Sequence, residues 1–233
     1  MKDREIDDIL ARAAKAPHDV DPALLDRVTE SIGASLTPVR PLPAAWLLTT
    51  AFVLMCGSVA VVTASFLGLH GLENLGSLER AAIFSVLAIL MVLMAAICAS
   101  QMIPGSRWRT FPVVLPALGS VALLAVFGVL FHDYGTENFV AQGIVCLRAG
   151  LFTAIPAAVA SWLLLRRGFV TGAASAGLIA GSLAGIAGIT MLELHCANFE
   201  LFHVMLWHTA VLPISGAAGA LLATALRRFI RFS

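Results

Sequence analysis

The sequence has few charged residues and no marked excess of either sign. Charged side chains make up 12% of the 233 residues, about half the share that is usual in soluble domains. The formal net charge is +1, whereas a nucleic-acid-binding domain would carry a basic stripe, so direct binding to nucleic acid is not expected. The motifs H-E-x-x-H, G-x-x-x-x-G-K-[ST] and G-x-S-x-G are also missing. We therefore expect no enzyme and no bound cofactor.

Long apolar runs, in contrast, are abundant, and hydrophobic residues make up 59% of the chain. Each run is close to the ~20 residues that a helix needs to cross a hydrocarbon core ~30 Å thick. The pattern predicts an all-α polytopic membrane protein, in which residues 1–43 form a short helical tail and residues 44–233 form a six-helix transmembrane bundle. The predicted spans are Ala44–Leu67, Ala81–Met102, Phe111–Phe131, Gly143–Leu165, Thr171–Leu192 and His203–Leu226.

Lys and Arg are distributed unevenly over the segments between these runs. Thirteen of the 15 lie in the N-terminal tail, the second and fourth breaks and the C-terminus, and only Arg80 and Arg148 lie elsewhere. The positive-inside rule therefore predicts that both termini are cytoplasmic. The six acids beyond residue 43 agree with this orientation, because all of them fall on the outer breaks.

No apolar run carries an acidic residue at mid-depth. Secondary transporters and proton pumps usually have ionisable groups or broken helices near the midplane, so this absence counts against transport. A transporter or channel subunit for a small solute is nevertheless the main alternative function. A third hypothesis is an intramembrane oxidoreductase that uses Cys146 and Cys196. It would need an activated thiolate, and although Arg148 is close to Cys146, there is no C-x-x-C motif.

The first 43 residues differ from the rest of the chain and contain eight of the 14 acids. Two short amphipathic helices are predicted there, one over Met1–Ala16 and one that follows Asp21 as N-cap, with Pro22 at its first position. The second helix is expected to end near Gly33. Two such helices are too small to form a core alone, so their apolar faces need a partner. The residues predicted to bind it are Ile6, Ile9, Leu10, Leu24, Leu25, Val28 and Ile32.

The polar faces of these two helices indicate what kind of partner is involved. A helix that lies on a membrane surface usually carries Lys and Arg on its polar face. Here the polar faces are mixed to acidic, and they include Asp3, Glu5, Asp7, Asp8, Asp26 and Glu30. Anionic lipid is therefore the weaker candidate, and a cytoplasmic protein with a basic or apolar groove is the stronger one.

The outer breaks collect an unusual set of side chains. Five of the six histidines lie on or near that side, together with two cysteines and several acids. The set comprises His70, His132, Asp133, Glu137, Cys146, Glu193, His195, Cys196, Glu200, His203 and His208.

Three interpretations of this set remain open. In the first, Cys146 and Cys196 form a disulfide in an oxidising compartment. In the second, His195, Cys196 and His203 bind a metal ion together with a carboxylate. In the third, the side chains are simply solvated at the interface. His203 and His208 lie five residues apart and do not share a helix face as an i, i+4 pair would, which weakens the metal hypothesis.

Small residues within the spans have a structural interpretation. Gly177, Gly181 and Gly185 recur every four residues, so they lie on one helix face and allow another backbone to approach closely. Tight packing inside the bundle is the favoured explanation, and a homodimer through this face is the alternative. Cys56 and Cys98 lie within the first two spans and are expected to be small buried hydrophobes.

Several short stretches of the C-terminal third carry a resemblance to a known family. They are Cys146 at the start of span four, Ile155-Pro156, Leu164-Leu165-Arg166-Arg167-Gly168, and Leu194-His195-Cys196 followed by Phe202 and Met205-Leu206-Trp207-His208. From about Gly143 onward the sequence resembles the NrsF-like negative regulators of sigma F, bacterial inner-membrane proteins that were long catalogued as a domain of unknown function. Family members typically have an aromatic residue where His208 stands, so this sequence departs at that position.

The resemblance implies a six-span anti-sigma factor of the bacterial inner membrane. In such a protein a cytoplasmic N-terminal tail holds a sigma factor of the extracytoplasmic-function type at the membrane, away from core polymerase. A periplasmic signal, either a metal or a redox change, is sensed through Cys146 and Cys196 and releases the sigma factor. The partners implied are thus a sigma factor and the lipid bilayer.

Overall fold

The computed structural model describes residues 8, 11, 21–35, 42–103, 112–168, 170 and 172–230. The chain divides into two compact units, Met1–Pro41 and Leu42–Ser233. Every regular element in the described ranges is helical and none is a strand, so the predicted all-α class is confirmed.

In the first unit, helix α2 spans Pro22–Ser35. The Asp21 carboxylate accepts a hydrogen bond of 3.0 Å from the backbone N–H of Ala23, which is the N-cap contact that the sequence predicts. The helix continues two residues beyond the predicted end at Gly33. The four predicted partner-binding side chains of this helix are about half exposed, at 51% for Leu24, 53% for Leu25, 46% for Val28 and 53% for Ile32.

The earlier predicted helix, over residues 1–16, falls largely outside the described residues. Asp8 and Ala11 are the positions described there, and both are helical. The predicted contact residues Ile6, Ile9 and Leu10 lie outside the described residues, so their part in partner binding stays a prediction.

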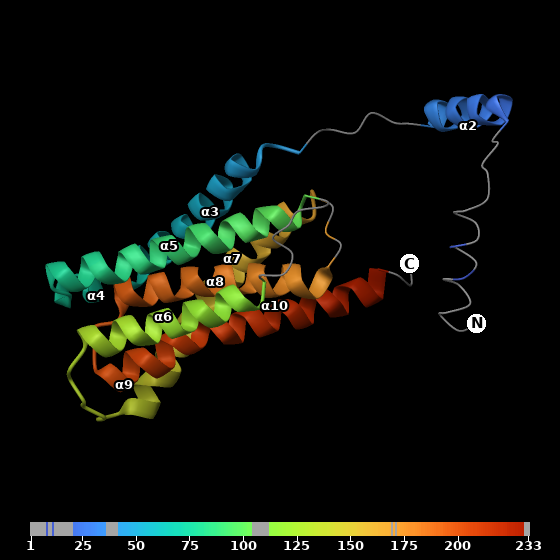
Figure 1. The fold of residues 1–233 in the computed structure, drawn as a ribbon. Helices are drawn as coiled ribbons and strands as arrows, with labels where there is room; N and C mark the ends of the chain where they lie inside the picture. The colour runs from blue at the N-terminus through green and yellow to red at the C-terminus, as the bar shows by residue number, and fades with distance from the viewer. Residues whose placement is uncertain are drawn as a thin grey trace. The chain divides into compact units, whose positions relative to one another are not determined.

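The second unit is a bundle of helices connected by short segments (Figure 1). Three of its elements, α9, η2 and α10, follow each other without a break, and η2 is a π-helical turn between two α-helical segments. The elements are α3 (Ala45–Leu67), α4 (His70–Asn74), α5 (Ser77–Gln101), α6 (Val114–Leu130), α7 (Phe139–Leu165), α8 (Ala173–His195), α9 (Leu201–His203), η2 (Val204–His208) and α10 (Thr209–Ile230).

Five helical segments within the described ranges are long and apolar enough to cross a membrane. They are α3, α5, α7, α8 and the continuous segment Leu201–Leu226. The third predicted span corresponds to α6, an apolar helix of 17 residues. At 1.5 Å per residue it is about 26 Å long, somewhat less than the ~30 Å of a hydrocarbon core. The structure thus supports a membrane protein with five candidate spans, one fewer than the sequence predicts.

The outward faces of the long helices are rich in apolar side chains. Phe66 is 87% exposed, and Phe152 and Leu221 are each 70% exposed. Soluble monomers rarely expose contiguous apolar patches larger than a few hundred Å². An apolar outer surface is instead what helices in contact with lipid require.

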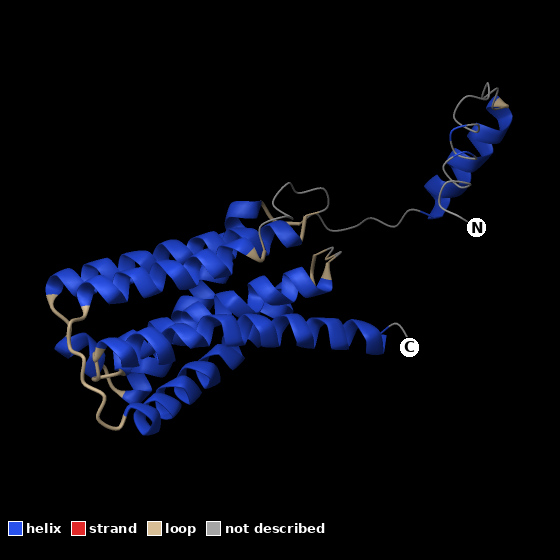
Figure 2. Cartoon of the chain, turned by 60° about the horizontal axis from the view of Figure 1, so that its bottom comes forward, coloured by secondary structure: helices blue, strands red, loops and turns tan. Residues whose placement is uncertain are grey.

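Figure 2 shows that the bundle consists of helices joined by loops. Helix α8 is its central helix, because it packs against α3, α5, α7 and α10. In its most apolar 18-residue window 78% of the residues are buried, against 28–44% for the other four segments. A β-carbon at Gly177, Gly181 or Gly185 would meet backbone or side-chain atoms of α10. The glycine face is therefore covered by another helix of the same chain, as the packing interpretation expects, and a homodimer would need a different surface.

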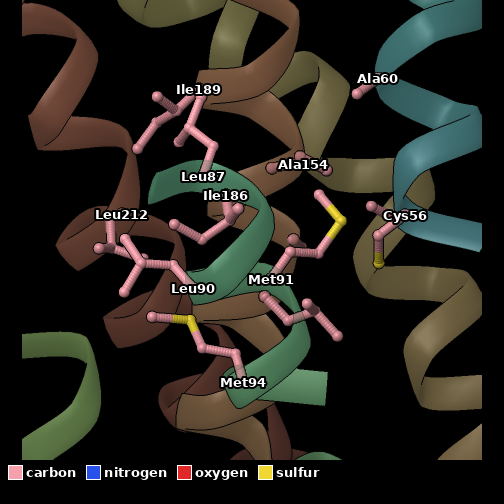
Figure 3. Packing of buried hydrophobic residues seen from close by; sticks show 14 of the residues in the cluster. Cys56, Ala60, Leu87, Leu90, Met91, Met94, Ala154, Ile186, Ile189 and Leu212 are labelled. Carbon is pink, nitrogen blue, oxygen red and sulfur yellow. The ribbon is translucent and has the colours of Figure 1, made fainter. Parts of the chain in front are cut away.

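Larger side chains fill the space around α8 (Figure 3). Met91 and Met94 of α5 are packed among Ile186 of α8 and Leu212 of α10, and all four are at least 94% buried. Cys56 and Cys98 belong to the same cluster, and both side chains are 0% exposed. Their predicted role as buried small hydrophobes agrees with this packing.

Three connections meet at one end of the bundle, the end that carries the labels α4 and α9 in Figure 1. We call it the histidine end, and it comprises residues 68–76, 131–138 and 195–203. His195 Nδ1 lies 3.0 Å from the carbonyl oxygen of Gly68, and the backbone N–H of Leu201 donates to the carbonyl of Asp133 over 2.7 Å. These bonds join the three connections into one cap. Arg166 and Arg167 lie at the opposite end, between α7 and α8.

Candidate functional site

Cys146 and Cys196 meet at the histidine end although 50 residues separate them in the chain. Cys146 lies in the second turn of α7, and Cys196 is the C-cap residue of α8. Their Sγ atoms are 3.5 Å apart and both thiols are free. The predicted proximity is therefore present, while the S–S bond, which would be about 2.05 Å long, is not formed.

Two histidines complete a compact group around this thiol pair. One potential ligand atom from each of Cys146, Cys196, His203 and His208 lies within 4.8 Å of all the others. His203 Nε2 is 3.7 Å from Cys196 Sγ, and the rings of His203 and His208 meet edge to face with centroids 5.3 Å apart. We call these four residues the Cys–His cluster.

The π-helical turn η2 explains how His203 and His208 come together. In a regular α-helix, residues five apart point about 140° away from each other. A π-helix hydrogen-bonds from i to i+5 and widens the helix by one residue per turn. Because η2 spans Val204–His208, the two histidines lie one wide turn apart on the same face. The expectation that His203 and His208 do not share a helix face is therefore wrong, because the turn between them is π-helical rather than α-helical.

Glu193 supports the cluster from the last turn of α8. Its Oε1 lies 2.7 Å from His208 Nδ1, and both side chains are 0% exposed. The pair fixes the roles of the two ring nitrogens, because Nδ1 faces the carboxylate and Nε2 is left for the cluster. His208 Nε2 has no hydrogen-bond partner among the described residues, and neither does Nδ1 of His203.

The other members of the predicted outer set lie elsewhere. His195, one of the three predicted metal ligands, bonds to the Gly68 carbonyl and lies beside the ring of His70, with ring centroids 6.0 Å apart. Two of the three predicted metal ligands, Cys196 and His203, thus lie in the Cys–His cluster, whereas His195 lies outside it. Four further side chains are solvent-exposed, as the interfacial interpretation expects: His70, His132, Asp133 and Glu137.

The Glu193–His208 pair is not evident from the amino-acid sequence. One local signal points toward it, because Glu193 precedes Cys196 by three residues and such residues are neighbours on a helix surface. Its partner lies 15 residues later on another helix, so the contact depends on how α8 and α10 pack. Burial also separates this carboxylate from the solvated acids around it, and burial is not visible in the composition of the loop.

The surroundings of Cys196 favour its protonated thiol. The hydrogen bond with Cys146, followed by burial, raises the pKa of Cys196 above its ordinary value, and the neighbouring imidazoles of His203 and His208 oppose this shift. The thiol is also 3.6 Å from the carbonyl oxygen of Asn198, to which it donates.

An open pocket of about 720 Å³ lies beside the cluster. Ala197 and Asn198, which directly follow Cys196, line one side of it, and Glu79, Asp133 and Glu200 contribute carboxylates to its wall. Such a polar, acidic pocket favours cations over anions. None of the four cluster residues lines this pocket, and Cys146 is the one of the four that is partly exposed.

Among known protein families, a family model described as negative regulator of sigma F matches residues 33–229 of the chain. This range contains all the apolar helices and the Cys–His cluster, and it leaves out nearly all of α2. No curated protein and no solved structure matches the chain.

Proposed function

Because this chain belongs to the NrsF family of negative regulators of sigma F, we propose that it is a membrane-anchored anti-sigma factor. It lies in the bacterial inner membrane with both termini in the cytoplasm. Its tail, residues 1–43, holds a sigma factor away from core polymerase. A periplasmic signal that reaches Cys146 and Cys196 releases the sigma factor.

The single observation that carries this proposal is the family match, and the placement of the tail and the thiols supports it. Helix α3 begins at Ala45, at the end of the bundle opposite the histidine end (Figure 1). The chain therefore enters the bundle at the end opposite Cys146 and Cys196. A protein that passes a signal across a membrane needs this arrangement, with its sensor on one side and its effector on the other.

A six-span topology accounts best for the path of the chain. Helix α5 ends at Gln101, whose Oε1 lies 3.4 Å from the Ser175 hydroxyl near the start of α8, at the end opposite the cluster. Helix α6 then returns to the histidine end, where Phe131 stacks on Phe199 with ring centroids 5.3 Å apart. An apolar helix that runs from one end to the other is the sixth span, with about 26 Å of helix in a slightly thinned bilayer.

The charges at the two ends support the proposed orientation. Arg166 and Arg167 are exposed at the end opposite the cluster, and two of the other arginines that the sequence assigns to that side, Arg107 and Arg109, lie outside the described residues. At the histidine end, the exposed Asp133 and Glu137 are acidic. By the positive-inside rule the histidine end is periplasmic.

The tail has the chemistry of a protein-binding segment. Leu24, Leu25 and Val28 expose an apolar strip on α2, while Asp26 and Glu30 give the other side an acidic character. An amphipathic helix of this kind docks its apolar face into a groove of a partner. Acidic flanks complement a basic rim, as expected for a sigma factor, which binds DNA through basic surfaces.

Signal transfer uses the direct contact between α8 and α3. Helix α8 carries Glu193 and ends at Cys196, and it packs against α3, to which the tail is attached. A change in the thiol pair that moves the end of α8 therefore also displaces α3. We propose that the cap of connections at the histidine end, which contacts both α8 and α3, switches between two arrangements.

A binding experiment tests this function. The full-length chain is purified in detergent and immobilised, and each sigma factor of the host bacterium is passed over it in turn. We expect one sigma factor to be retained, and a mild thiol oxidant to accelerate its release. Retention of none of them, or release that is identical after Cys146→Ser, would contradict the proposal.

A further inference from the structure

We propose that Cys146, Cys196, His203 and His208 form a four-coordinate binding site for a thiophilic divalent metal ion, with Zn²⁺ as its prototype. Glu193 is a positioning residue for His208. The proposal deepens the sensor role proposed above by naming a ligand for the same site. It concerns the membrane bundle alone, so the metal and the sigma factor can be measured separately.

The distances in the cluster are close to those of a tetrahedral site. With Zn–S bonds of about 2.3 Å and Zn–N bonds of about 2.0–2.1 Å, neighbouring ligand atoms lie roughly 3.3–3.8 Å apart. The Cys146–Cys196 separation of 3.5 Å and the Cys196–His203 separation of 3.7 Å fall in this range. Since all four ligand atoms lie within 4.8 Å of one another, small side-chain rotations suffice to close the site.

The unpartnered imidazole nitrogen of His208 is an independent indication of a ligand. Its Nε2 is buried without a hydrogen-bond partner among the described residues, although buried polar atoms in proteins almost always have one. A metal ion bound at Nε2 supplies the missing interaction. The second buried histidine, His203, also directs its Nε2 toward Cys196 Sγ.

Glu193 provides the second shell that metal-binding histidines usually have. A ligating histidine commonly donates its other ring N–H to a carboxylate, which fixes its tautomer and orientation. The 2.7 Å contact between Glu193 Oε1 and His208 Nδ1 has this geometry. It also explains why a carboxylate is completely buried at the end of α8, where a merely solvated acid would face water.

The π-helical turn is the backbone feature that assembles the site. It places His203 and His208 on one face, whereas an α-helix of the same sequence would direct them apart. π-Helical turns are rare and occur frequently at functional sites. The distortion η2 thus brings the two imidazoles to the thiol pair.

The donor set selects the class of ion. Two thiolates and two imidazoles suit Zn²⁺ and the softer Cd²⁺, whereas Mg²⁺ and Ca²⁺ require oxygen ligands. Binding releases the two thiol protons, and the two thiolate charges then balance the charge of the ion.

The test uses the full-length chain in detergent, reduced and treated with a chelator. Titration with Zn²⁺ in competition with a chromophoric chelator measures stoichiometry and affinity. Co²⁺ substitution gives an optical spectrum that reports tetrahedral geometry and thiolate ligation. We expect one ion per chain and a Co²⁺ spectrum with thiolate charge-transfer bands. A chain that binds no ion, or whose Co²⁺ spectrum lacks these bands, would overturn the proposal without requiring any variant.

Variants then assign the ligands. Glu193→Gln should lower the affinity about 10- to 100-fold and leave the tetrahedral Co²⁺ spectrum in place. Cys146→Ser and His208→Ala should lower the affinity at least as much and change that spectrum, because a ligand is lost. Two matched controls, His195→Ala and Cys98→Ala, should bind Zn²⁺ like the wild type. If His195→Ala weakened binding while His208→Ala did not, the ligand set would be wrong.

Retention of the sigma factor, measured on the same preparations, separates the two proposals. Loss of Zn²⁺ binding with intact sigma-factor retention would overturn only the metal site. Tight Zn²⁺ binding by a chain that retains no sigma factor would overturn only the regulatory function. Circular dichroism and gel filtration identify variants that fail to fold, and for these the conservative replacement His208→Gln is measured instead.

Discussion

His208 Nδ1 lies 2.7 Å from Oε1 of Glu193, and both side chains are completely buried. The contact ties the last turn of α8 to the π-helical turn that precedes α10. It orients the imidazole whose other nitrogen faces the thiol pair. The pair therefore stabilises the bundle and also positions His208 in the site.

The first prediction concerns this pair. Glu193→Leu leaves the His208 Nδ1 group buried without a partner, so we expect a loss of about 1–3 kcal/mol in the free energy of unfolding. Glu193→Gln keeps an acceptor and should cost less. Thermal or denaturant unfolding in detergent measures both changes. The double variant with His208→Leu should be less destabilised than the sum of the single variants, and strict additivity would show that the two residues do not interact.

The second prediction tests the close packing of α8 on α10. Gly181→Ala places a β-carbon against the backbone of Ser215, so the helices must separate, and we expect a destabilisation of about 1–3 kcal/mol. Gly57→Ala in α3 is the matched control, because nothing lies within 4 Å of its added β-carbon. That variant should be neutral or slightly stabilising, since Ala has the higher helix propensity. Equal effects on the unfolding of the two variants would contradict the packing argument.

Some features of the fold follow from local sequence patterns, whereas others depend on tertiary packing. The apolar runs and the cap at Asp21 are local patterns, and the helices α3, α5, α7 and α8 follow from them. Helix α6 is shorter than its run predicts. The proximity of Cys146 and Cys196 follows from a short connection between α7 and α8, which makes them an antiparallel pair.

The composition of the cluster did not follow from the sequence. His208 joins it only because η2 is π-helical, and no local pattern indicates that distortion. His195 is adjacent to Cys196 in the chain, yet its ring bonds to the Gly68 carbonyl and lies outside the cluster. Glu193 cannot be distinguished in the sequence from the other outer acids, because its burial depends on how the end of α8 packs against η2.

The third prediction concerns the tail. Leu24→Asp combined with Val28→Asp places two charges on the apolar face of α2. Burial of each such side chain contributes about 1.5–3 kcal/mol, so binding to the sigma factor should weaken by orders of magnitude while membrane insertion is unchanged. The control, Asp26→Ala with Glu30→Ala, alters the opposite face and should retain the sigma factor more strongly than the test variant. Wild-type affinity after the double Asp change would mean that this face does not bind the partner.

The fourth prediction concerns topology. A reporter fused after Ser233 and a reporter inserted between Glu193 and Glu200 should report opposite compartments, cytoplasmic for the first and periplasmic for the second. A fusion between α6 and α7, at Gly135, should also be periplasmic, because α6 crosses the membrane in the six-span model. If the Ser233 and Glu193–Glu200 reporters lie in the same compartment, the six-span topology fails. A cytoplasmic Gly135 reporter would show that α6 does not cross.

The last prediction concerns Cys146 and Cys196 as a unit. Their Sγ atoms are already 3.5 Å apart, so a mild thiol oxidant should join them by removing two protons and two electrons. We expect a product two mass units lighter, with no change at Cys56 and Cys98, which are fully buried. Because a disulfide needs both residues, Cys146→Ser and Cys196→Ser should have matching effects on sigma-factor release, and the double variant should add nothing further.

Thiol labelling from the histidine end measures the state of this pair directly. In the reduced wild type both thiols should react, Cys146 faster because it is partly exposed, and oxidation should protect both. Zn²⁺ should protect them as well if the ion occupies the proposed site, and a chelator should reverse that protection whereas only a reductant reverses the disulfide. The labelling rates could be unchanged by both oxidant and Zn²⁺, and the single variants could release the sigma factor like the wild type. Both results together would show that the thiol pair does not sense the signal.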